Sequence, residues 1–319
     1  MDTERLELLV QIATWYYEEN LSQEDIAGRV GLSRSMVSRL LQKARDHGLI
    51  EVRVRYPLKR DAPLEHRLCQ TFSLSQASVL RDAPADRVTM LRRVGELGAR
   101  RLQQLLHDEV SIGVGWGTWV YAVVRAMPVS HITGARVIQL IGSIGSGDPT
   151  VDGAQTAHWL AQSLGAVSRF LHAPLIVENE ETARALTQDP AIARTLALAG
   201  EVEVALVGVG APDPVLSGMR RAGYFSEVDL ARLRKAGAVG DIVGYHLDAH
   251  GCPLDVSINR RLVGISLETL RVIPATIVAA AGASKAAAIL AVLRGGYADV
   301  LVTTAATASA VLALHGKRN

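Results

Sequence analysis

The stretch 21–48 constrains the fold most, because its caps and breaks predict two short helices joined by a tight turn. Ser22 is a typical N-cap residue, and Asp25 stands where a capping box needs an acid, with Asp in place of Glu. Gly31 ends the first helix where the backbone needs a left-handed residue, and Ser33 caps the second helix. This order is typical of a helix-turn-helix, whose second helix enters the major groove of DNA.

The second predicted helix has two chemically different faces. Apolar residues at spacings of three and four predict its buried stripe, Met36, Val37, Leu40, Leu41 and Ala44. The opposite face offers donors for base edges and cations for phosphates. We expect base contacts from Arg34, Ser35, Ser38 and Arg39. We expect phosphate contacts from Gln23, Lys43, Arg53 and Arg55, and the predicted DNA-contacting set also includes Ser33 and Gln42.

Charge is distributed unevenly along this part of the chain. Residues 29–55 hold seven basic side chains against two acids, whereas residues 1–28 hold seven acids against Arg5, and the whole chain carries only +2. A local basic patch is what contact with phosphates requires. The alternative is an ordinary helical hairpin with a solvated basic face.

An alternating segment and a proline-containing segment follow the two helices. Residues 49–56 alternate apolar with charged side chains, which predicts the wing of a winged helix with Arg53 and Arg55 facing outward. A plain edge strand is the alternative. Residues 57–63 contain two prolines and three charged residues, a composition typical of a linker.

Composition excludes several classes of protein. No apolar run is long enough to span a bilayer, and the charged start of the chain is unlike a secretory signal. Two isolated cysteines, Cys69 and Cys252, indicate neither a disulfide framework nor a zinc site. We therefore expect a cytoplasmic protein with no membrane partner, no metal and no cofactor.

The remainder of the chain alternates strands with helices. Predicted strands are 77–80, 110–114, 135–141, 169–171, 202–209, 242–247, 277–281 and 300–302. Predicted helices are 64–72, 86–106, 118–127, 152–164, 180–198, 226–235, 284–294 and 305–314. Nearly continuous apolar strands indicate a parallel sheet covered on both faces, and hence a doubly wound α/β domain. The expected domains are a winged helix-turn-helix (1–56), a linker (57–63) and an α/β domain (64–319).

Small or glycine-rich loops follow several of these strands, at the edge where such sheets bind ligands. They are 113–118, 142–148, 208–210 and 280–285. Glycines let the backbone approach an anion, and a helix N-terminus attracts one. The first loop lacks both the Walker A and the dinucleotide fingerprints, and a tight strand–helix turn would also explain it. Together the loops favour a small phosphorylated or polyhydroxylated ligand.

Two further segments carry possible ligand groups. Asp241 could accept hydrogen bonds from sugar hydroxyls, although a turn residue is the alternative. Residues 246–252 contain two histidines, an aspartate and a cysteine, which raises the question of a metal site, but residues 248–251 also fit a turn.

Taken together, these motifs resemble the SorC family of sugar-binding bacterial transcription regulators, of the SorC/DeoR type, over nearly the whole chain. The motifs are 21–48 with its following strand, 113–118, 240–242, 248–251, 282–285, 293–296 and 300–307. The resemblance implies an α/β effector domain similar to sugar-phosphate isomerases and deaminases. It also implies a homo-oligomer, dimer or tetramer, whose affinity for double-stranded operator DNA changes with the effector.

The resemblance also implies where the effector binds. Gly115, Gly117 and Thr118 would lie near its phosphate, with Gly142 and Ser143 beside them, Asp241 at the sugar and Lys285 at its polar end. Trp116 belongs to the same loop and to the predicted effector site. The chain departs from the family pattern at Thr303 and Thr304, where members often have an acid, and at His246 and His250.

The sequence thus predicts a transcriptional regulator and not an enzyme. The alternative is a phosphosugar isomerase or deaminase with a DNA-binding appendage. Such an enzyme needs a placed general acid and base, and the loops offer mainly glycines, hydroxyls, Asp241 and Lys285.

Overall fold

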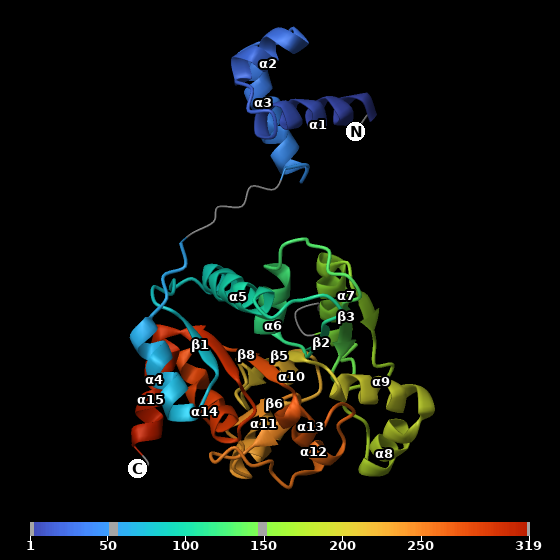
Figure 1. Cartoon of the computed structure of the whole chain (residues 1–319), viewed down its shortest axis with the longest axis vertical. Coiled ribbons are helices and arrows are strands. Elements are labelled where there is room, and N and C mark those ends of the chain that lie inside the picture. The colour runs from blue at the N-terminus through green and yellow to red at the C-terminus, as the bar shows by residue number, and fades with distance from the viewer. Residues whose placement is uncertain (1–2, 51–56, 146–151, 318–319) are drawn as a thin grey trace. The chain divides into compact units, whose positions relative to one another are not determined.

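The computed structural model describes residues 3–50, 57–145 and 152–317, with side chains from Arg5 onward. Its contacts divide the chain into two compact units, Met1–Pro57 and Leu58–Asn319 (Figure 1). Among the described residues, no helix combines the length and the apolarity that crossing a membrane would take.

The N-terminal unit consists of three helices, α1 (Thr3–Tyr17), α2 (Gln23–Val30) and α3 (Arg34–Asp46). The predicted capping box is confirmed, because Ser22 accepts a hydrogen bond from the Asp25 amide while the Asp25 carboxylate accepts one from the Ser22 amide. Gly31 has a φ of 65° and ends α2, and Ser33 accepts a hydrogen bond from the Met36 amide at the start of α3. Local hydrogen bonds therefore set the helix-turn-helix geometry.

The core of this unit differs in detail from the predicted apolar stripe. Its buried residues are Leu9, Ile12, Ala13, Ile26, Ala27, Val37, Leu40, Leu41 and Ala44. Met36 was expected among them but is 40% exposed, because it lies in the first turn of α3 beside the exposed serines. The predicted wing, with Arg53 and Arg55, lies largely on residues 51–56, outside the described residues.

The C-terminal unit is built on a parallel sheet with the strand order β1-β9-β8-β5-β2-β3-β4. The strands are β1 (Gln76–Leu80), β2 (Ser111–Val114), β3 (Arg136–Gln139), β4 (Val167–Arg169), β5 (Val204–Gly210), β8 (Ala275–Ala279) and β9 (Val300–Thr304). Strands β2, β5 and β8 lie side by side at its centre and are almost wholly buried. This arrangement confirms the predicted doubly wound α/β class.

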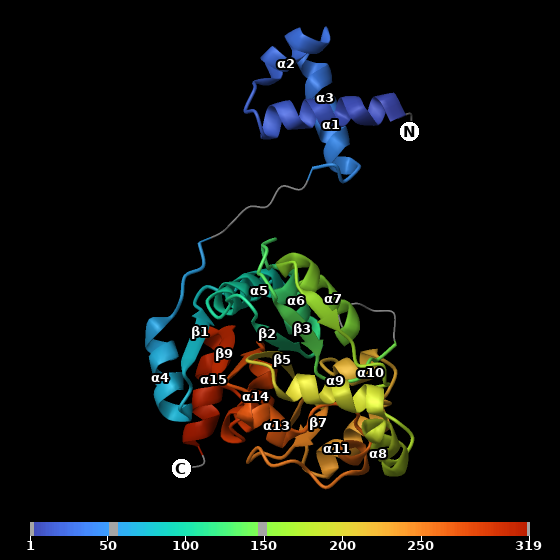
Figure 2. The same cartoon turned by 45° about the vertical axis from the view of Figure 1, so that its right-hand side comes forward.

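Helices cover both faces of the sheet (Figures 1 and 2). One face packs against α5 (Arg87–Gln103), α6 (Thr118–Arg125) and α7 (Gly153–Leu164). The other packs chiefly against α4 (Ala62–Phe72), α14 (Ala286–Arg294) and α15 (Ala305–Gly316). The remaining helices of this unit are α8 (Glu180–Gln188), α9 (Pro190–Gly200), α10 (Gly218–Arg221), α11 (Glu227–Lys235), α12 (Ser257–Arg260), α13 (Leu267–Val272) and the 3₁₀ helix η1 (Ala283–Lys285).

Many predicted elements differ in their limits from the structure, as three of them illustrate. The helix expected at 180–198 is two helices, because Asp189 ends α8 and caps α9, which begins at Pro190. The strand expected at 242–247 is an antiparallel hairpin, β6 (Gly240–Ile242) and β7 (Tyr245–Leu247), whose turn contains Gly244 at a φ of 91°. Strand β4 precedes the predicted 169–171.

The segment expected as a linker, 57–63, is structured at its end. Arg60 forms an antiparallel bridge with Leu80, and α4 begins at Ala62. Arg60 also pairs with Glu65, so this part of the segment belongs to the C-terminal unit.

Helices α5 and α6 approach closely at Gly95, where an added Cβ would overlap the carbonyl oxygen of Ala122. Backbone cannot move aside as a flexible side chain can. We expect Gly95→Ala to lower the free energy of unfolding by about 1–3 kcal/mol, as overpacking does. The matched change Gly316→Ala meets no neighbouring atom and should change it by less than about 0.5 kcal/mol. Denaturant unfolding measures both, and equal effects would contradict the close approach.

Candidate functional site

The exposed face of α3 carries most of the predicted DNA-contacting side chains. Arg34, Ser35, Ser38, Arg39 and Gln42 are exposed, and Lys43 is half-buried. Arg34 and Arg39 form no hydrogen bond or ion pair with any residue that the structure describes, so their donors face solvent.

Other groups of this face already have partners within the N-terminal unit. Gln42 donates to the Asp46 carboxylate at 2.9 Å, and Ser33 and Ser35 share a hydrogen bond of 3.0 Å. Arg45 donates to the Tyr17 hydroxyl and lies over its ring, so this cation braces α3 against α1. Arg34 and Arg39 are therefore the cations of α3 best placed for an external partner.

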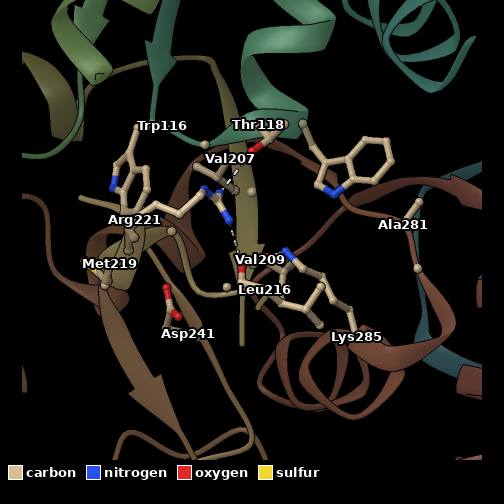
Figure 3. A pocket seen from close by; sticks show the side chains of 18 of the residues that line it. Trp116, Thr118, Val207, Val209, Leu216, Met219, Arg221, Asp241, Ala281 and Lys285 are labelled. Carbon is tan, nitrogen blue, oxygen red and sulfur yellow. Dashed lines mark hydrogen bonds between the residues drawn. The ribbon is translucent and has the colours of Figure 1, made fainter. Parts of the chain in front are cut away.

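A pocket in the C-terminal unit lies where the central strands end (Figure 3). After β2, the loop Gly115–Thr118 leads into α6, and after β8, Ala281–Lys285 leads into α14. The end of β5, Val207–Gly210, forms the floor between them. Six predicted effector residues line this pocket: Gly115, Trp116, Gly117, Thr118, Asp241 and Lys285.

Two helices begin at the pocket without a side-chain cap. Gly117 precedes α6 with a φ of 116°, and Gly282 precedes the continuous segment η1–α14 with a φ of 118°. Neither conformation suits other residues, and neither glycine can cap the amides that follow. Most other helices in the described part of the chain begin with a Ser, Thr, Asp or Asn cap. Uncapped amides and two positive dipole ends suit an anion.

The hydroxyl of Thr307 holds the second of these loops in place. It accepts a hydrogen bond of 2.9 Å from the Gly282 amide. Thr304 caps α15 by accepting a hydrogen bond from the Thr307 amide, and the two threonine hydroxyls are 2.8 Å apart. Thr304 and Thr307 therefore support this wall of the pocket.

A buried carboxylate and a half-buried ammonium flank the pocket floor. Asp241 lies on β6 opposite Gly210, and any Cβ at position 210 would overlap its carboxylate. Burial raises the pKa of Asp241, an effect opposed by the charges of His246 and Lys285. Lys285 donates to the Val209 carbonyl at 2.7 Å, and burial lowers its pKa to about 8. Burial thus shifts the two pKa values in opposite directions, upward for Asp241 and downward for Lys285.

The structure adds two arginines that the sequence did not single out. Arg221, at the end of α10, donates to the Thr118 hydroxyl at 3.2 Å and reaches across the pocket in Figure 3. Arg87, at the start of α5, also lines the pocket, and both arginines lower the pKa of Lys285. No local motif marks them, because α5 and α10 reach the site only through the tertiary fold.

Trp116 closes the pocket on the side of α10. Its indole lies against Gly218, where an added Cβ would stand 2.7 Å from the ring. The pocket is partly open, and its cavity volume is about 100 Å³.

Two of the predicted effector residues lie outside this pocket. Gly142 packs against the backbone of Pro174, and its amide donates to the Val263 carbonyl at 2.8 Å. Ser143 accepts a hydrogen bond of 3.1 Å from the Gln139 side chain and lines a separate hollow. Both residues hold the chain between β3 and residue 175 in place.

The segment 246–252 forms the predicted turn. The Asp248 carboxylate accepts hydrogen bonds from the amides of His250 and Cys252 at 2.8 and 2.9 Å. His246 is buried under Phe225 and its backbone is bonded to Asn259. In the described part of the chain, no three His, Cys, Asp or Glu side chains gather as a metal site requires.

Comparison with known proteins assigns this architecture to a family. Residues 56–313 match the family model described as "Putative sugar-binding domain", and residues 6–62 match a Crp-like helix-turn-helix domain. The chain is 32% identical to the deoxyribonucleoside regulator of Bacillus subtilis over 98% of this chain and 99% of that protein. It is 35% identical to the transcriptional regulator LsrR of Klebsiella pneumoniae over 97% and 93%. The chain belongs to the SorC family of sugar-binding transcriptional regulators.

Solved structures of this family share the fold. The full-length sorbitol operon regulator SorC of Klebsiella pneumoniae superposes with a TM-score of 0.72 at 27% identity, over 97% of this chain and all of that one. A DeoR family regulator from Listeria monocytogenes gives 0.72 at 27% identity, over 78% of this chain and 98% of that one. These relatives are named as regulators, which confirms the prediction of a transcriptional regulator and disfavours the alternative of an isomerase or deaminase.

The charges of Asp241 and Lys285 support each other, which gives a prediction. Because the Asp241 charge raises the pKa of Lys285, Asp241→Asn should lower that pKa further below its present value of about 8. The pH dependence of Lys285 labelling by an amine-reactive reagent measures the pKa. Asp248→Asn, on an exposed turn, is the control and should leave it unchanged. An unchanged pKa in Asp241→Asn would contradict the coupling.

Proposed function

We propose that the SorC-family pocket binds a phosphorylated sugar or polyol and that its occupancy controls operator binding by α3. The observation that carries the proposal is the pair of uncapped helix starts at Gly117 and Gly282, with Lys285 between the loop and the floor. A phosphate there would cap both helices and pair with a cation that is already desolvated.

The polar groups divide the proposed ligand into two ends. Thr118 and the loop amides lie at the anionic end, where Arg221 and Arg87 add positive charge. Asp241 would accept hydrogen bonds from sugar hydroxyls, and Trp116 would lie beside the sugar ring. Relatives named for deoxyribonucleosides and for sorbitol support a small sugar or polyol. Gly142 and Ser143, which lie outside the pocket, are left out of this proposal.

We also propose how the regulator meets DNA. Arg34, Ser35, Ser38 and Arg39 would read base edges, and Gln23, Lys43, Arg53 and Arg55 would contact phosphates. As a homodimer or homotetramer in the cytoplasm, the protein would prefer a palindromic or repeated site. Ser33 and Gln42 would complete the contact surface. Residues 1–56 would read DNA, residues 64–319 would bind the effector, and of the segment 57–63 only the part before the residues bonded to the sheet would serve as linker.

The effector proposal predicts a pH dependence. Lys285 binds an anion only when protonated, and its pKa is about 8, so its cationic fraction falls as the pH rises through that value. A sugar phosphate is already dianionic above about pH 7. Affinity should therefore fall by up to about tenfold per pH unit above 8.

Melting of the full chain with ribose 5-phosphate, glucose 6-phosphate and sorbitol 6-phosphate identifies the effector, with the free sugars and sorbitol as controls. Titrations of the best compound at pH 7 to 9 then test the dependence. The Lys285→Gln variant should bind this compound more weakly, and its affinity should no longer depend on pH in this range. Stabilisation by the free sugars alone would contradict a phosphorylated effector. An affinity that does not change between pH 7 and 9 would contradict the role of Lys285.

The DNA proposal predicts a loss of discrimination in one variant. If Arg39 reads a base, Arg39→Ala should lower affinity for the preferred duplex by about 1–3 kcal/mol and relax preference at one position. Selection from random duplexes with the full chain supplies that sequence. Arg5→Ala, on the exposed surface of α1, is the matched loss of one cation. Unchanged preference in Arg39→Ala, or an equal change in Arg5→Ala, would exclude base reading by Arg39.

A further inference from the structure

The chain enters the C-terminal unit through a short antiparallel addition to the sheet. The Asp61 amide donates to the Val79 carbonyl at 2.9 Å, and the Arg81 amide donates to the Lys59 carbonyl at 2.9 Å. Residues 59–61, which we call the clasp, thus pair with the C-terminal end of the edge strand β1. The clasp is the first segment after residue 58 that is bonded to this sheet.

Side chains strengthen the clasp. Arg60 makes two hydrogen bonds of 2.8 Å to the Glu65 carboxylate, a bidentate pair whose acid is largely buried. Glu65 also accepts a hydrogen bond of 2.8 Å from the Val79 amide, which would otherwise be unpaired on this edge. The pair Lys59–Asp82, at 3.6 Å, is exposed, and the pair Arg81–Asp61, also at 3.6 Å, is partly exposed, so both contribute less.

The same strand end leads directly to the effector pocket. Residues 81–86 connect β1 to α5, whose first turn supplies Arg87 and Met90 to the pocket wall. Asp86 caps that turn by accepting a hydrogen bond of 2.7 Å from the Thr89 amide. Arg93 of α5 donates to the Asp82 carbonyl, and Asp82 pairs with Lys59 of the clasp. Pocket wall and clasp therefore share one short connection.

We propose that the clasp transmits effector occupancy to the segment that leads to the DNA-binding unit. This inference rests on the proposed function of the pocket. An anion held by Arg87 fixes the first turn of α5 and residues 81–86, and so slows the opening of the two clasp hydrogen bonds. The effector thereby acts on the DNA-binding unit through the freedom of its tether, a coupling between two distant sites through one local element.

Amide hydrogen exchange of the full chain tests this coupling. The probes are inorganic phosphate and the three sugar phosphates above, with thermal stabilisation reporting binding separately. On binding, the Asp61 and Arg81 amides should exchange more slowly by about tenfold, within the range of allosteric coupling. The Ser75 amide, bonded to the Asp299 carbonyl near the opposite end of β1, is the control and should not change.

The possible outcomes separate the two proposals. Thermal stabilisation of the chain without slower exchange of the Asp61 and Arg81 amides would overturn the proposed role of the clasp, and the proposed effector pocket would be unaffected. An equal slowing at Ser75 would indicate general stiffening and would also overturn the clasp. If no phosphorylated probe stabilised the chain, the effector proposal and this inference would both fall.

Variants of the clasp supply the second readout. Arg60→Gln removes the charged pair with Glu65 outside the pocket, so it should lose the slowing at Asp61, while its effector affinity should fall by no more than the coupling factor of about tenfold. On the duplex obtained by selection, the fold-change in affinity that the effector causes should approach one. Arg260→Gln, which removes the exposed pairs with Glu180 and Asp255, is the matched control. Should Arg60→Gln unfold, Asp82→Asn tests the same connection more gently; retained coupling in the folded variant would overturn the proposal.

Discussion

The alignment of three parallel strands, β2, β5 and β8, is the constraint on which the rest of the structure depends. Parallel pairing brings their carboxyl ends to one edge, so the two glycine loops and the floor of β5 meet, although paired residues are 92 apart in sequence between β2 and β5 and 71 apart between β5 and β8. Because both loops begin helices without a capping side chain, this edge concentrates unpaired amides and positive dipole ends. The sheet thus gathers at one edge the groups that the proposed effector site uses.

Burial gives the pocket its second property. Asp241 fits only because residue 210 has no side chain, and Lys285 is tied to the Val209 carbonyl at the same strand end. Each group is held in surroundings that disfavour its charge, and each charge favours the other. A ligand that carries both an anionic group and hydroxyl groups would pair its anion with Lys285 and donate hydrogen bonds from its hydroxyls to Asp241. That chemistry agrees with a family named for sugar binding.

Regulation requires that this edge influence a separate unit, and the strand order offers a route. Strand β1 lies at the margin of the sheet, beside β9, so its outer edge is available to the incoming chain. The clasp occupies that edge next to the strand end that leads to Arg87. Edge strands are usually protected by charged groups or covering segments. Here the covering segment is also the tether of the DNA-binding unit.

The sequence alone determined the helix-turn-helix, because Ser22, Gly31 and Ser33 act through bonds spanning only a few residues. It also determined the class of the sheet, since apolar runs mark buried strands wherever they pair. Six of the residues that it proposed for the effector site line the pocket, five of them in the loops and helix starts before α6 and α14, and Asp241 within β6. Only the tertiary structure decided that Arg87 and Arg221 join them, that Gly142 and Ser143 do not, and that Met36 is exposed. These outcomes depend on contacts between segments remote in sequence or on where a helix turn meets its core, which local patterns do not encode.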